Sequence, residues 1–312
     1  MTEVRRSGVW WRRAYGLLCC CSGLVLAGTR WDLLEIFSHF QLQLGSCWLL
    51  AFALLAVPKV RAAFWRPGRS AALGLVLALA HGGLIAGLWL PSSGAALDRE
   101  PARIQAVWFN MQHSAEALSS LAAGMRADPP DLWVLIETNG DTAPPQPELY
   151  PHVFHDEPHH LGIWSRWPLE NTRAEAVPEE RDQLTADLVI GRYRLPLLAV
   201  HWRIPIHAAQ LRAVETSIRI AQAREHLLML GDLNSTPWSP RFRRLEDEGG
   251  LRRGPGLGAR GTWAADPWHI LSLPIDQGFT KGEVRITELE LLPWTASDHR
   301  PVRARIDFVN RR

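Results

Sequence analysis

The stretch Leu227-Leu228-Met229-Leu230-Gly231-Asp232-Leu233-Asn234 decides the fold, because a short apolar run ends in an acid and an amide. Four consecutive apolar residues before a glycine are typical of a buried strand. The same pattern recurs along the chain, and the polar residues at or just after these runs are Asn110, Glu137, His201, Asp232, Asn234 and His299. Because such strand ends converge at one rim of a sheet, we expect these side chains to form a single site.

The apolar runs alternate with helical patterns. Strands are expected over residues 104–109, 132–136, 161–165, 197–201 and 227–230, and helices over residues 115–126 and 208–223. This alternation predicts a layered α/β (α+β) domain. A single histidine after a strand is more often structural than catalytic, but six polar residues at successive strand ends favour a functional site.

The apolar residues that precede this domain are concentrated in three segments. Residues 14–28, 42–57 and 71–90 contain no Lys, Arg, Asp or Glu, and each approaches the ~20 residues that span a bilayer. They predict three transmembrane helices within residues 1–91, a linker over 92–102 and a globular domain over 103–312. A cleaved signal peptide is the alternative for the first segment.

Charges beside the segments predict the orientation. The N-terminal flank and the loop after the second segment are basic, which is typical of the cytoplasmic side. Three spans then place the globular domain in the periplasm or outside the cell, at a bacterial inner membrane. All four cysteines lie in the predicted spans, so the exported domain has no thiol for a disulfide.

The charge balance differs between the two parts. Residues 1–99 contain ten basic and four acidic residues, whereas residues 100–312 contain 24 basic and 28 acidic residues. Proteins that bind nucleic acids without sequence preference neutralise phosphates with a basic surface. The net charge of −4 over residues 100–312 therefore makes nucleic acid the less favoured partner.

Several motifs resemble one known family in the same order. They are FNMQ (109–112), LIE (135–137), SRWP (165–168), VH (200–201), GDLNSTPWS (231–239), GTW (261–263), PID (274–276) and SDHRPV (297–302). This series resembles the endonuclease/exonuclease/phosphatase superfamily, which has the DNase I-like fold, and in particular its membrane-anchored bacterial branch. The resemblance implies a four-layered α/β sandwich over nearly all of residues 103–308.

The resemblance also implies a divalent metal, Mg²⁺ with Mn²⁺ as the alternative. Glu137 would be its principal ligand, with Asn110 and Asp298 completing the metal site. A carboxylate is a hard oxygen ligand of the kind that Mg²⁺ prefers. Two positions depart from the family pattern, because Gln112 stands where nucleases often have an acid and Gln277 stands where membrane-anchored relatives often have histidine.

The remaining roles concern proton transfer and the phosphate. The resemblance implies that Asp232 positions the attacking water, and that Asn234 holds Asp232 and donates to a phosphate oxygen. His299 would act as general base or as a donor, with Asp276 fixing its tautomer. His201 would be the general acid. We also expect Arg300 and Asn110 to contact the phosphate, because an arginine fork matches phosphate oxygens.

These expectations predict a membrane-anchored, metal-dependent phosphoesterase that hydrolyses extracytoplasmic phosphate esters, with lipid-linked esters as the substrate class. A membrane-tethered nuclease and a catalytically idle membrane scaffold are the alternatives. A zinc hydrolase is less favoured because the chain has no H-E-x-x-H motif, and a serine hydrolase because it has no G-x-S-x-G motif.

Overall fold

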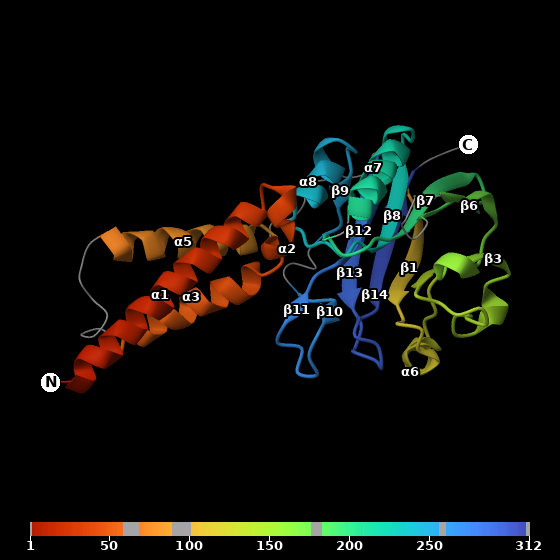
Figure 1. The fold of residues 1–312 in the computed structure, drawn as a ribbon. Helices are drawn as coiled ribbons and strands as arrows, with labels where there is room; N and C mark the ends of the chain where they lie inside the picture. Colours follow the sequence, from red (N-terminus) through yellow and green to blue (C-terminus); the bar gives the residue numbers. More distant parts are fainter. Residues whose placement is uncertain are drawn as a thin grey trace. The chain divides into compact units, whose positions relative to one another are not determined.

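The computed structural model describes residues 2–58, 69–88, 101–175, 183–206, 208–255 and 260–309. These residues form two compact units (Figure 1). The first, here called the helical unit, comprises Met1–Leu90 together with Trp238–Pro240. The second, here called the sandwich unit, comprises Pro91–Pro237 and Arg241–Arg312.

Among its described residues, the helical unit contains three longer helices and two short ones: α1 (Thr2–Gly28), η1 (Asp32–Leu34), α2 (Glu35–Ser38), α3 (Gln41–Leu55) and α5 (Arg69–Gly87). Among the described residues, no helix has both the length and the apolar character needed to cross a bilayer. The prediction of three transmembrane helices is therefore not supported. The third predicted span also runs past residue 88 into residues that the structure does not describe.

Two observations concern the length of α3 and the packing of the helical unit. Helix α3 has 15 residues, which gives a length of about 22 Å against a hydrocarbon core of about 30 Å. Polar groups also pair in the interior of the unit: Trp48 Nε1 donates to Ser22 Oγ at 2.8 Å, and His81 Nδ1 lies 2.6 Å from Gln41 Oε1. The helices thus pack on one another through buried polar as well as apolar side chains.

The sandwich unit contains two six-stranded sheets. Its elements are β1 (Ala102–Asn110), α6 (Ala115–Met125), β2 (Leu132–Ile136), η2 (Pro147–Leu149), β3 (His152–Asp156), η3 (Glu157–His159), β4 (Leu161–Ser165), β5 (Leu169–Glu175), β6 (Gln183–Ile190), β7 (Tyr193–His201), α7 (Ala208–Gln222), β8 (Leu227–Asp232), α8 (Pro240–Asp247), β9 (Arg252–Arg253), β10 (Trp263–Ala264), β11 (Ser272–Leu273), β12 (Asp276–Lys281), β13 (Val284–Leu291) and β14 (Val302–Phe308).

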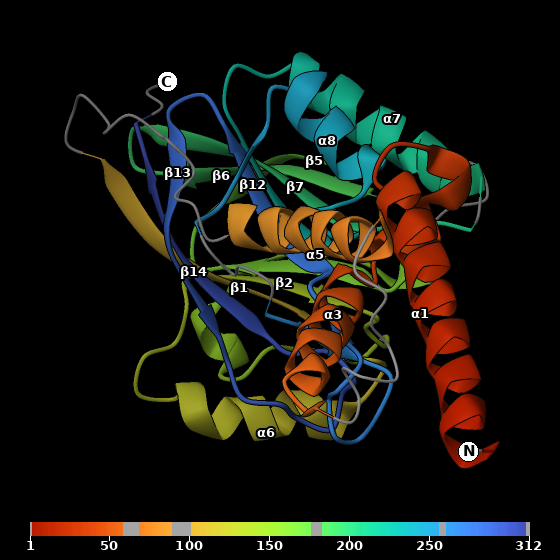
Figure 2. The same cartoon turned by 90° about the vertical axis from the view of Figure 1, so that its left-hand side faces the viewer.

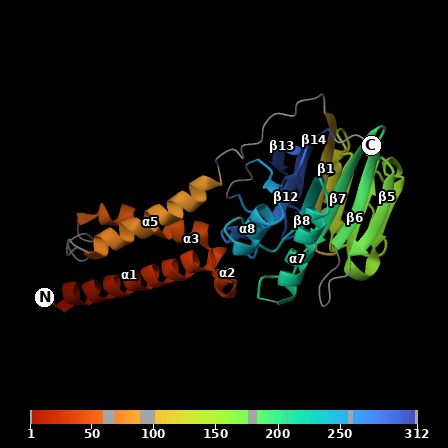
Figure 3. The ribbon, with the colours of Figure 1, turned by 90° about the horizontal axis from the view of Figure 1, so that it is seen from above.

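The first sheet has the strand order β13-β14-β1-β2-β4-β3, and the second has β5-β6-β7-β8-β12-β9. Figure 2 shows the layers of this unit in the order α6, first sheet, second sheet, and then α7 with α8. Seen from above, β5, β6 and β7 run side by side at one edge of the unit (Figure 3). The predicted four-layered α/β sandwich is confirmed for this unit.

Strand alternation builds the core. In β1, Ile104 and Trp108 point into the apolar layer between the sheets, whereas Val107 and Phe109 point to the layer beneath α6. Strand β8 likewise alternates between the central layer and a third layer beneath α7 and α8. This two-residue periodicity is what a strand buried on both faces requires.

Each sheet contains one parallel pair of strands. Strand β1 pairs with β2 in the first sheet, and β7 pairs with β8 in the second. Helix α6 connects the first pair and α7 connects the second. Parallel strands end at the same edge of a sheet, so Asn110 and Glu137 come together from one sheet, and His201 and Asp232 from the other.

A glycine allows β7 and β8 to pair closely beside these ends. Gly231 has a φ of +152°, and a Cβ atom there would lie 2.0 Å from Val200 O. Replacing Gly231 with Ala is expected to lower the free energy of unfolding by about 2–4 kcal/mol, because the backbone must shift or strain. The midpoint of denaturant-induced unfolding measures this change.

Gly191 is the matched control for that substitution. Its φ is +56°, but a Cβ atom there would meet nothing within 4 Å. The Gly191→Ala change therefore carries only the backbone cost of about 1 kcal/mol. Equal losses for Gly191→Ala and Gly231→Ala would contradict the steric explanation.

Candidate functional site

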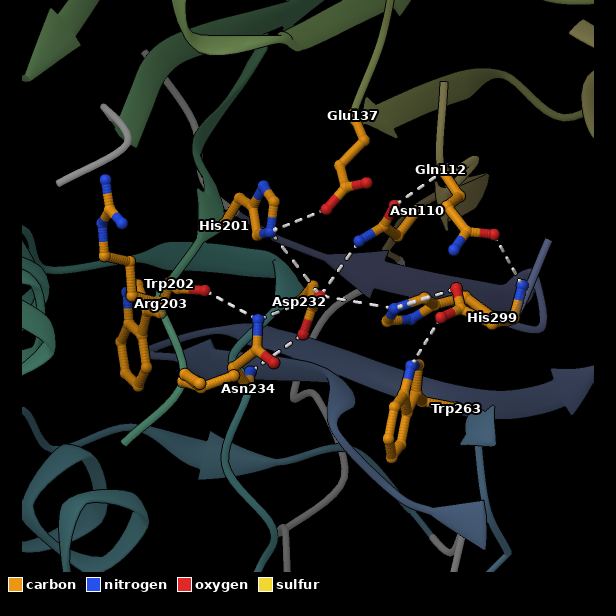
Figure 4. Close-up of a pocket in the computed structure, with 12 residues that line it drawn as sticks. Asn110, Gln112, Glu137, His201, Trp202, Arg203, Asp232, Asn234, Trp263 and His299 are labelled. Atoms are coloured by element: carbon orange, nitrogen blue, oxygen red, sulfur yellow. Dashed lines mark hydrogen bonds and ion pairs between the residues drawn. The ribbon is translucent and has the colours of Figure 1, made fainter. Parts of the chain in front are cut away.

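A cavity of about 320 Å³ opens where β1, β2, β7 and β8 end. Figure 4 shows the side chains around it, which come from strand ends of both six-stranded sheets, from the segments that follow them, from β10 and from the loop before β14. Its lining residues are Asn110, Gln112, Glu137, His201, Trp202, Arg203, Ile204, Asp232, Asn234, Trp263, Asp298 and His299. Six of the predicted strand-end residues are thus in one cavity.

Polar contacts across the cavity join the two sheets. Asn110 Nδ2, at the end of β1, donates to Asp232 Oδ2, at the end of β8, over 3.1 Å. His201 Nε2, from β7, lies 3.5 Å from Glu137 Oε1 and 3.8 Å from Asp232 Oδ2 (Figure 4). The strand ends of the two sheets are therefore connected by contacts between their polar side chains.

A third cross-sheet contact lies behind the cavity. His299 Nδ1 is 2.9 Å from Asp276 Oδ2, and both residues are almost completely buried. The Ser297 hydroxyl accepts a hydrogen bond from His299 N at 3.0 Å and donates to Asn110 O at 2.8 Å. With Nδ1 bonded to Asp276, His299 presents Nε2 toward Asp232 Oδ2, 3.7 Å away.

Asp232 is buried among several donors. Its carboxylate accepts hydrogen bonds from Asn234 N at 2.8 Å, Asn110 Nδ2 at 3.1 Å and Asn234 Nδ2 at 3.3 Å. Loss of hydration and then the nearby charge of Asp276 raise the pKa of Asp232 to about 7, although His299 and these donors act in the opposite direction. The carboxyl group is thus close to the range where it accepts and releases a proton near neutral pH.

The pKa of the His299 imidazole depends most on burial and on the acidic neighbours of the ring. Burial lowers its pKa, but the negative charges of Asp276 and Asp232 together outweigh this effect and raise the pKa to about 9. The Asp276 carboxylate therefore both orients the ring and favours its protonated form.

Three oxygen-bearing side chains of the cavity fit a hard divalent cation. Glu137 and Asp298 offer carboxylate oxygens and Asn110 an amide oxygen, which are donors that Mg²⁺ and Mn²⁺ prefer. Trp263 Nε1 donates to Asp298 Oδ2 at 2.9 Å, and such hydrogen bonds commonly orient metal-ligating carboxylates. The chemistry of this donor set agrees with the sequence prediction.

Asp232, Asp276 and His299 also group closely enough to suggest a metal, since one ligand atom from each lies within 4.8 Å of the others. Most of these atoms are already engaged, however. Asp232 accepts hydrogen bonds at both oxygens, and Asp276 Oδ2 is bonded to His299. Asp276 Oδ1 is buried without a hydrogen-bond partner in the described structure. We therefore assign this group to proton handling and the oxygen set to the cation.

Left-handed backbone conformations cluster at the site. Glu137, Asn234 and Gln112 have φ values of +54°, +47° and +51°. Non-glycine residues in this region carry local strain, and such residues concentrate at functional sites. At Glu137 the turn directly after β2 sends the side chain toward His201 (Figure 4).

The sequence profile of the endonuclease/exonuclease/phosphatase family matches residues 107–299, which is more than half of the chain. The chain belongs to this family. It is therefore an enzyme, a hydrolase that acts on phosphoester bonds. Enzymes of the family generally depend on divalent metal ions.

Three solved structures resemble the chain in fold. D. rerio TDP2 complexed with a single-strand DNA product is 15% identical, with a TM-score of 0.53, and the match covers 66% of this chain and 99% of that one. The family member from Beutenbergia cavernae is 19% identical, with a TM-score of 0.51 and coverage of 66% and 72%. The one from Bacteroides vulgatus is 11% identical, with a TM-score of 0.54 and coverage of 67% and 100%. No curated protein matches the chain.

Arg300, which we expected to contact the phosphate, does not line the cavity. Its guanidinium donates from Nε to Leu292 O at 2.8 Å and from Nη2 to Leu291 O at 3.1 Å. It lies over the ring of Trp294 and does not line the cavity. The guanidinium of Arg300 is thus engaged by two backbone carbonyls and the Trp294 ring, outside the cavity lining.

Five residues that line the cavity were not predicted as site residues, namely Gln112, Trp202, Arg203, Ile204 and Trp263. Arg203 lies two positions after His201 in a stretch that continues from β7, and this spacing returns a side chain to the same side of an extended chain. Trp263 belongs to the GTW motif, but only the structure shows its bond to Asp298. Gln112 also lines the cavity, and its Oε1 accepts a hydrogen bond from Asp298 N at 3.4 Å.

Proposed function

We propose that the enzyme is a membrane-associated phosphoesterase of the membrane-anchored bacterial branch, which uses Mg²⁺, or alternatively Mn²⁺, to hydrolyse extracytoplasmic, lipid-linked phosphate esters. The observation that carries the lipid part is the apolar surface of the helical unit. Trp10, Leu17, Leu49 and Leu79 are each between 65% and 74% exposed. Large exposed apolar side chains on all three longer helices are what a membrane-associated unit would present to lipid.

The cation would be held by Glu137, Asp298 and Asn110. When bound, Mg²⁺ would neutralise negative charge that grows on the phosphate oxygens in the transition state. The carboxylate of Glu137 is also placed against His201. This contact places the imidazole beside an acidic group at the cavity, where a general acid would be needed.

Asp232, Asn234 and His299 would act on the water and the phosphate. The hydrogen bonds from Asn234 fix the carboxylate of Asp232, so that it orients a water molecule and accepts its proton. His299 Nε2 is the ring atom nearest Asp232, and in its protonated form it donates to a phosphate oxygen. His201, on the other side of Asp232, would protonate the leaving oxygen.

The composition of the sandwich unit favours lipid phosphoesters over nucleic acids. Residues 100–312 have four more acidic than basic residues, and a polyanionic substrate would be repelled over most of that surface. Arg203 is the cation beside the cavity, which suffices for a single phosphate group. A nuclease activity remains the competing outcome of the experiment below.

The full-length enzyme and an Asp232→Ala variant provide the test. Each is incubated with a polyprenyl phosphoester, a phospholipid and single-stranded DNA, in Mg²⁺, Mn²⁺ or Ca²⁺ and then in excess chelator. We expect metal-dependent release of phosphate or headgroup from a lipid substrate, with loss of activity in chelator and in the variant. Efficient cleavage of DNA without release from any lipid would contradict the lipid proposal.

We further propose that the sandwich unit faces away from the cytoplasm at a bacterial inner membrane. The proposal is supported by the basic residues of the loop after the second apolar segment, namely Lys59, Arg61, Arg66 and Arg69, since such residues are retained on the cytoplasmic side. A reporter that is active only outside the cytoplasm, fused after Arg312, tests it. Activity of a cytoplasmic reporter at that position would contradict the orientation.

A further inference from the structure

The hairpin of β10 and β11 carries an apolar tip next to the catalytic cavity. Residues 265–271 connect the two strands, and Figure 1 shows this connection extending beyond the ends of the sheets. Trp268 is 79% exposed, Ile270 72% and Leu271 46%. Three large apolar side chains within four residues are thus directed into solvent, and we call them the hairpin tip.

The conformation of the tip is fixed from within. The carboxylate of Asp266 accepts hydrogen bonds from the backbone N–H groups of Trp268, Ile270 and Leu271 at 3.1, 3.1 and 2.8 Å. These bonds lower the pKa of Asp266, so the carboxylate stays charged and bonded near neutral pH. The segment is therefore held in a shape that keeps its apolar side chains outside.

One side chain of the same loop anchors it to the sandwich unit. The ring of His269 stacks on Trp294, with ring centroids 3.9 Å apart and an interplanar angle of 3°. His269 has a φ of +56°, a strained conformation that this stacking helps to hold. His269 thus points inward, whereas the residues on either side of it, Trp268 and Ile270, point outward.

The base of the hairpin belongs to the catalytic site. Trp263, in β10, lines the cavity and donates to the carboxylate of Asp298. Ala264 N donates to Asp298 O at 3.0 Å, and Trp263 forms an isolated β-bridge with His299. Across the cavity, Ile204 lines the site and is 44% exposed. Because the base of the same hairpin lines the cavity, a membrane or partner that binds the tip also lies near the cavity.

We propose that the hairpin tip docks the sandwich unit onto a lipid bilayer and so brings the catalytic cavity to the membrane surface. Tryptophan with aliphatic neighbours is the composition that enters the interface between headgroups and acyl chains. Single-stranded nucleic acid is a poorer fit, since bases stack on aromatic rings and two of the three tip residues are aliphatic. The substrate part of this inference rests on the proposed function, whereas bilayer docking does not.

The carboxylate of Asp266 does not oppose this docking. It is the only acidic residue in residues 260–273, and its charge is directed at three backbone donors. Arg260 precedes the hairpin and is exposed, and burial and then the charge of Arg260 lower the pKa of Arg300. Basic side chains near the hairpin favour anionic headgroups.

The test measures insertion of the tip without reference to catalysis. In the full-length chain with all four cysteines changed to Ala, an Ile270→Cys variant is labelled with an environment-sensitive fluorophore. Vesicles of phosphatidylethanolamine and phosphatidylglycerol are then added, with and without bromine-labelled acyl chains. We expect a blue shift and bromine quenching, because the label moves from water into the apolar interface.

An Arg192→Cys label is the matched control. Arg192 lies in the exposed turn before β7, whereas the opposite end of that strand is His201 in the cavity. We expect vesicles to leave this label unchanged, even if the helical unit binds them. The proposal is overturned if the label at residue 270 does not respond to vesicles, or if both labels respond equally. A response at residue 270 to single-stranded DNA and not to vesicles also overturns it.

A second variant connects docking to catalysis. The Trp268→Ser, Ile270→Ser double variant is expected to reduce the rate on a vesicle-borne phosphoester roughly 30-fold, since interfacial binding scales with buried apolar area. Its rate on a soluble phosphoester should match that of the unchanged enzyme. Equal losses on both substrates would indicate damage to the site and contradict docking, whereas inactivity of the unchanged enzyme on every lipid would contradict only the substrate assignment.

Discussion

Replacing Glu137 with Gln is expected to lower kcat/KM for phosphoester hydrolysis by about 1000-fold, since a divalent cation contributes several kcal/mol of charge stabilisation in such reactions. The amide has nearly the same shape as the carboxylate and keeps one oxygen, but it lacks the negative charge. We therefore also expect the Mg²⁺ concentration for half-maximal activity to rise at least tenfold. Steady-state assays at several Mg²⁺ concentrations measure both effects.

Glu116→Gln is the matched control for this change. Glu116 lies in the first turn of α6, is exposed and is not part of the cavity lining. Its substitution removes the same charge from the sandwich unit and should leave the activity and Mg²⁺ dependence unchanged. Activity of Glu137→Gln within a factor of three of the unchanged enzyme would mean that the principal cation ligand lies elsewhere.

Asp276→Asn is expected to reduce kcat by about 1000-fold with little change in KM, because an amide at this position no longer fixes the proton and orientation of the His299 ring. The loss falls on kcat because Asp276 lies behind the imidazole and outside the cavity lining. Assays with a soluble phosphoester separate kcat from KM. A reduction of less than tenfold would contradict a positioning role for this carboxylate.

A spectroscopic readout distinguishes this role from general damage to the fold. The charges of Asp276 and Asp232 are what raise the pKa of His299 to about 9. Removing one negative charge lowers that pKa, so the imidazole of Asp276→Asn should lose its proton at a lower pH than in the unchanged enzyme. An NMR titration of labelled histidine measures the shift. An unchanged titration would mean that Asp276 does not influence the ring.

The central strands could be predicted because buried strands consist mainly of apolar residues. Residues 132–136 and 161–165 are continuous apolar runs, and they form β2 and β4 within those bounds. Strand β5 could not be predicted in this way. Its sequence LENTRAE has no apolar alternation, and it is a strand because it pairs with β6 at the edge of the second sheet. Its structure depends on a neighbour that local sequence does not reveal.

Most site residues could be predicted because parallel strands end together, and the strand ends carry the polar side chains. The expectation for Arg300 was based on its proximity to His299 in sequence, whereas the structure engages its guanidinium with the backbone carbonyls of Leu291 and Leu292. The contact of Trp263 with Asp298 joins residues 35 positions apart. Such a contact depends on how the hairpin lies on the sandwich, which motif spacing does not encode.

For the helical unit, apolar composition alone did not predict the environment of each helix face. Apolar composition predicted three spans, but composition does not distinguish lipid from a neighbouring helix as the partner of an apolar face. Trp48 is almost completely buried and donates to Ser22, whereas Leu49 beside it is largely exposed. Only the packed structure separates the two environments.

The polar contacts Asn110–Asp232 and His299–Asp276 connect one sheet to the other. The sheets otherwise meet mainly through hydrocarbon, which tolerates small sliding displacements because dispersion forces have little directional preference. Hydrogen bonds are directional, so these contacts set the alignment of the sheets at the edge where catalysis occurs. The reaction rate consequently depends on how the two sheets are aligned. A substitution that creates a cavity at Leu197, in the central layer, would therefore change the reaction rate even where the secondary structure stays intact.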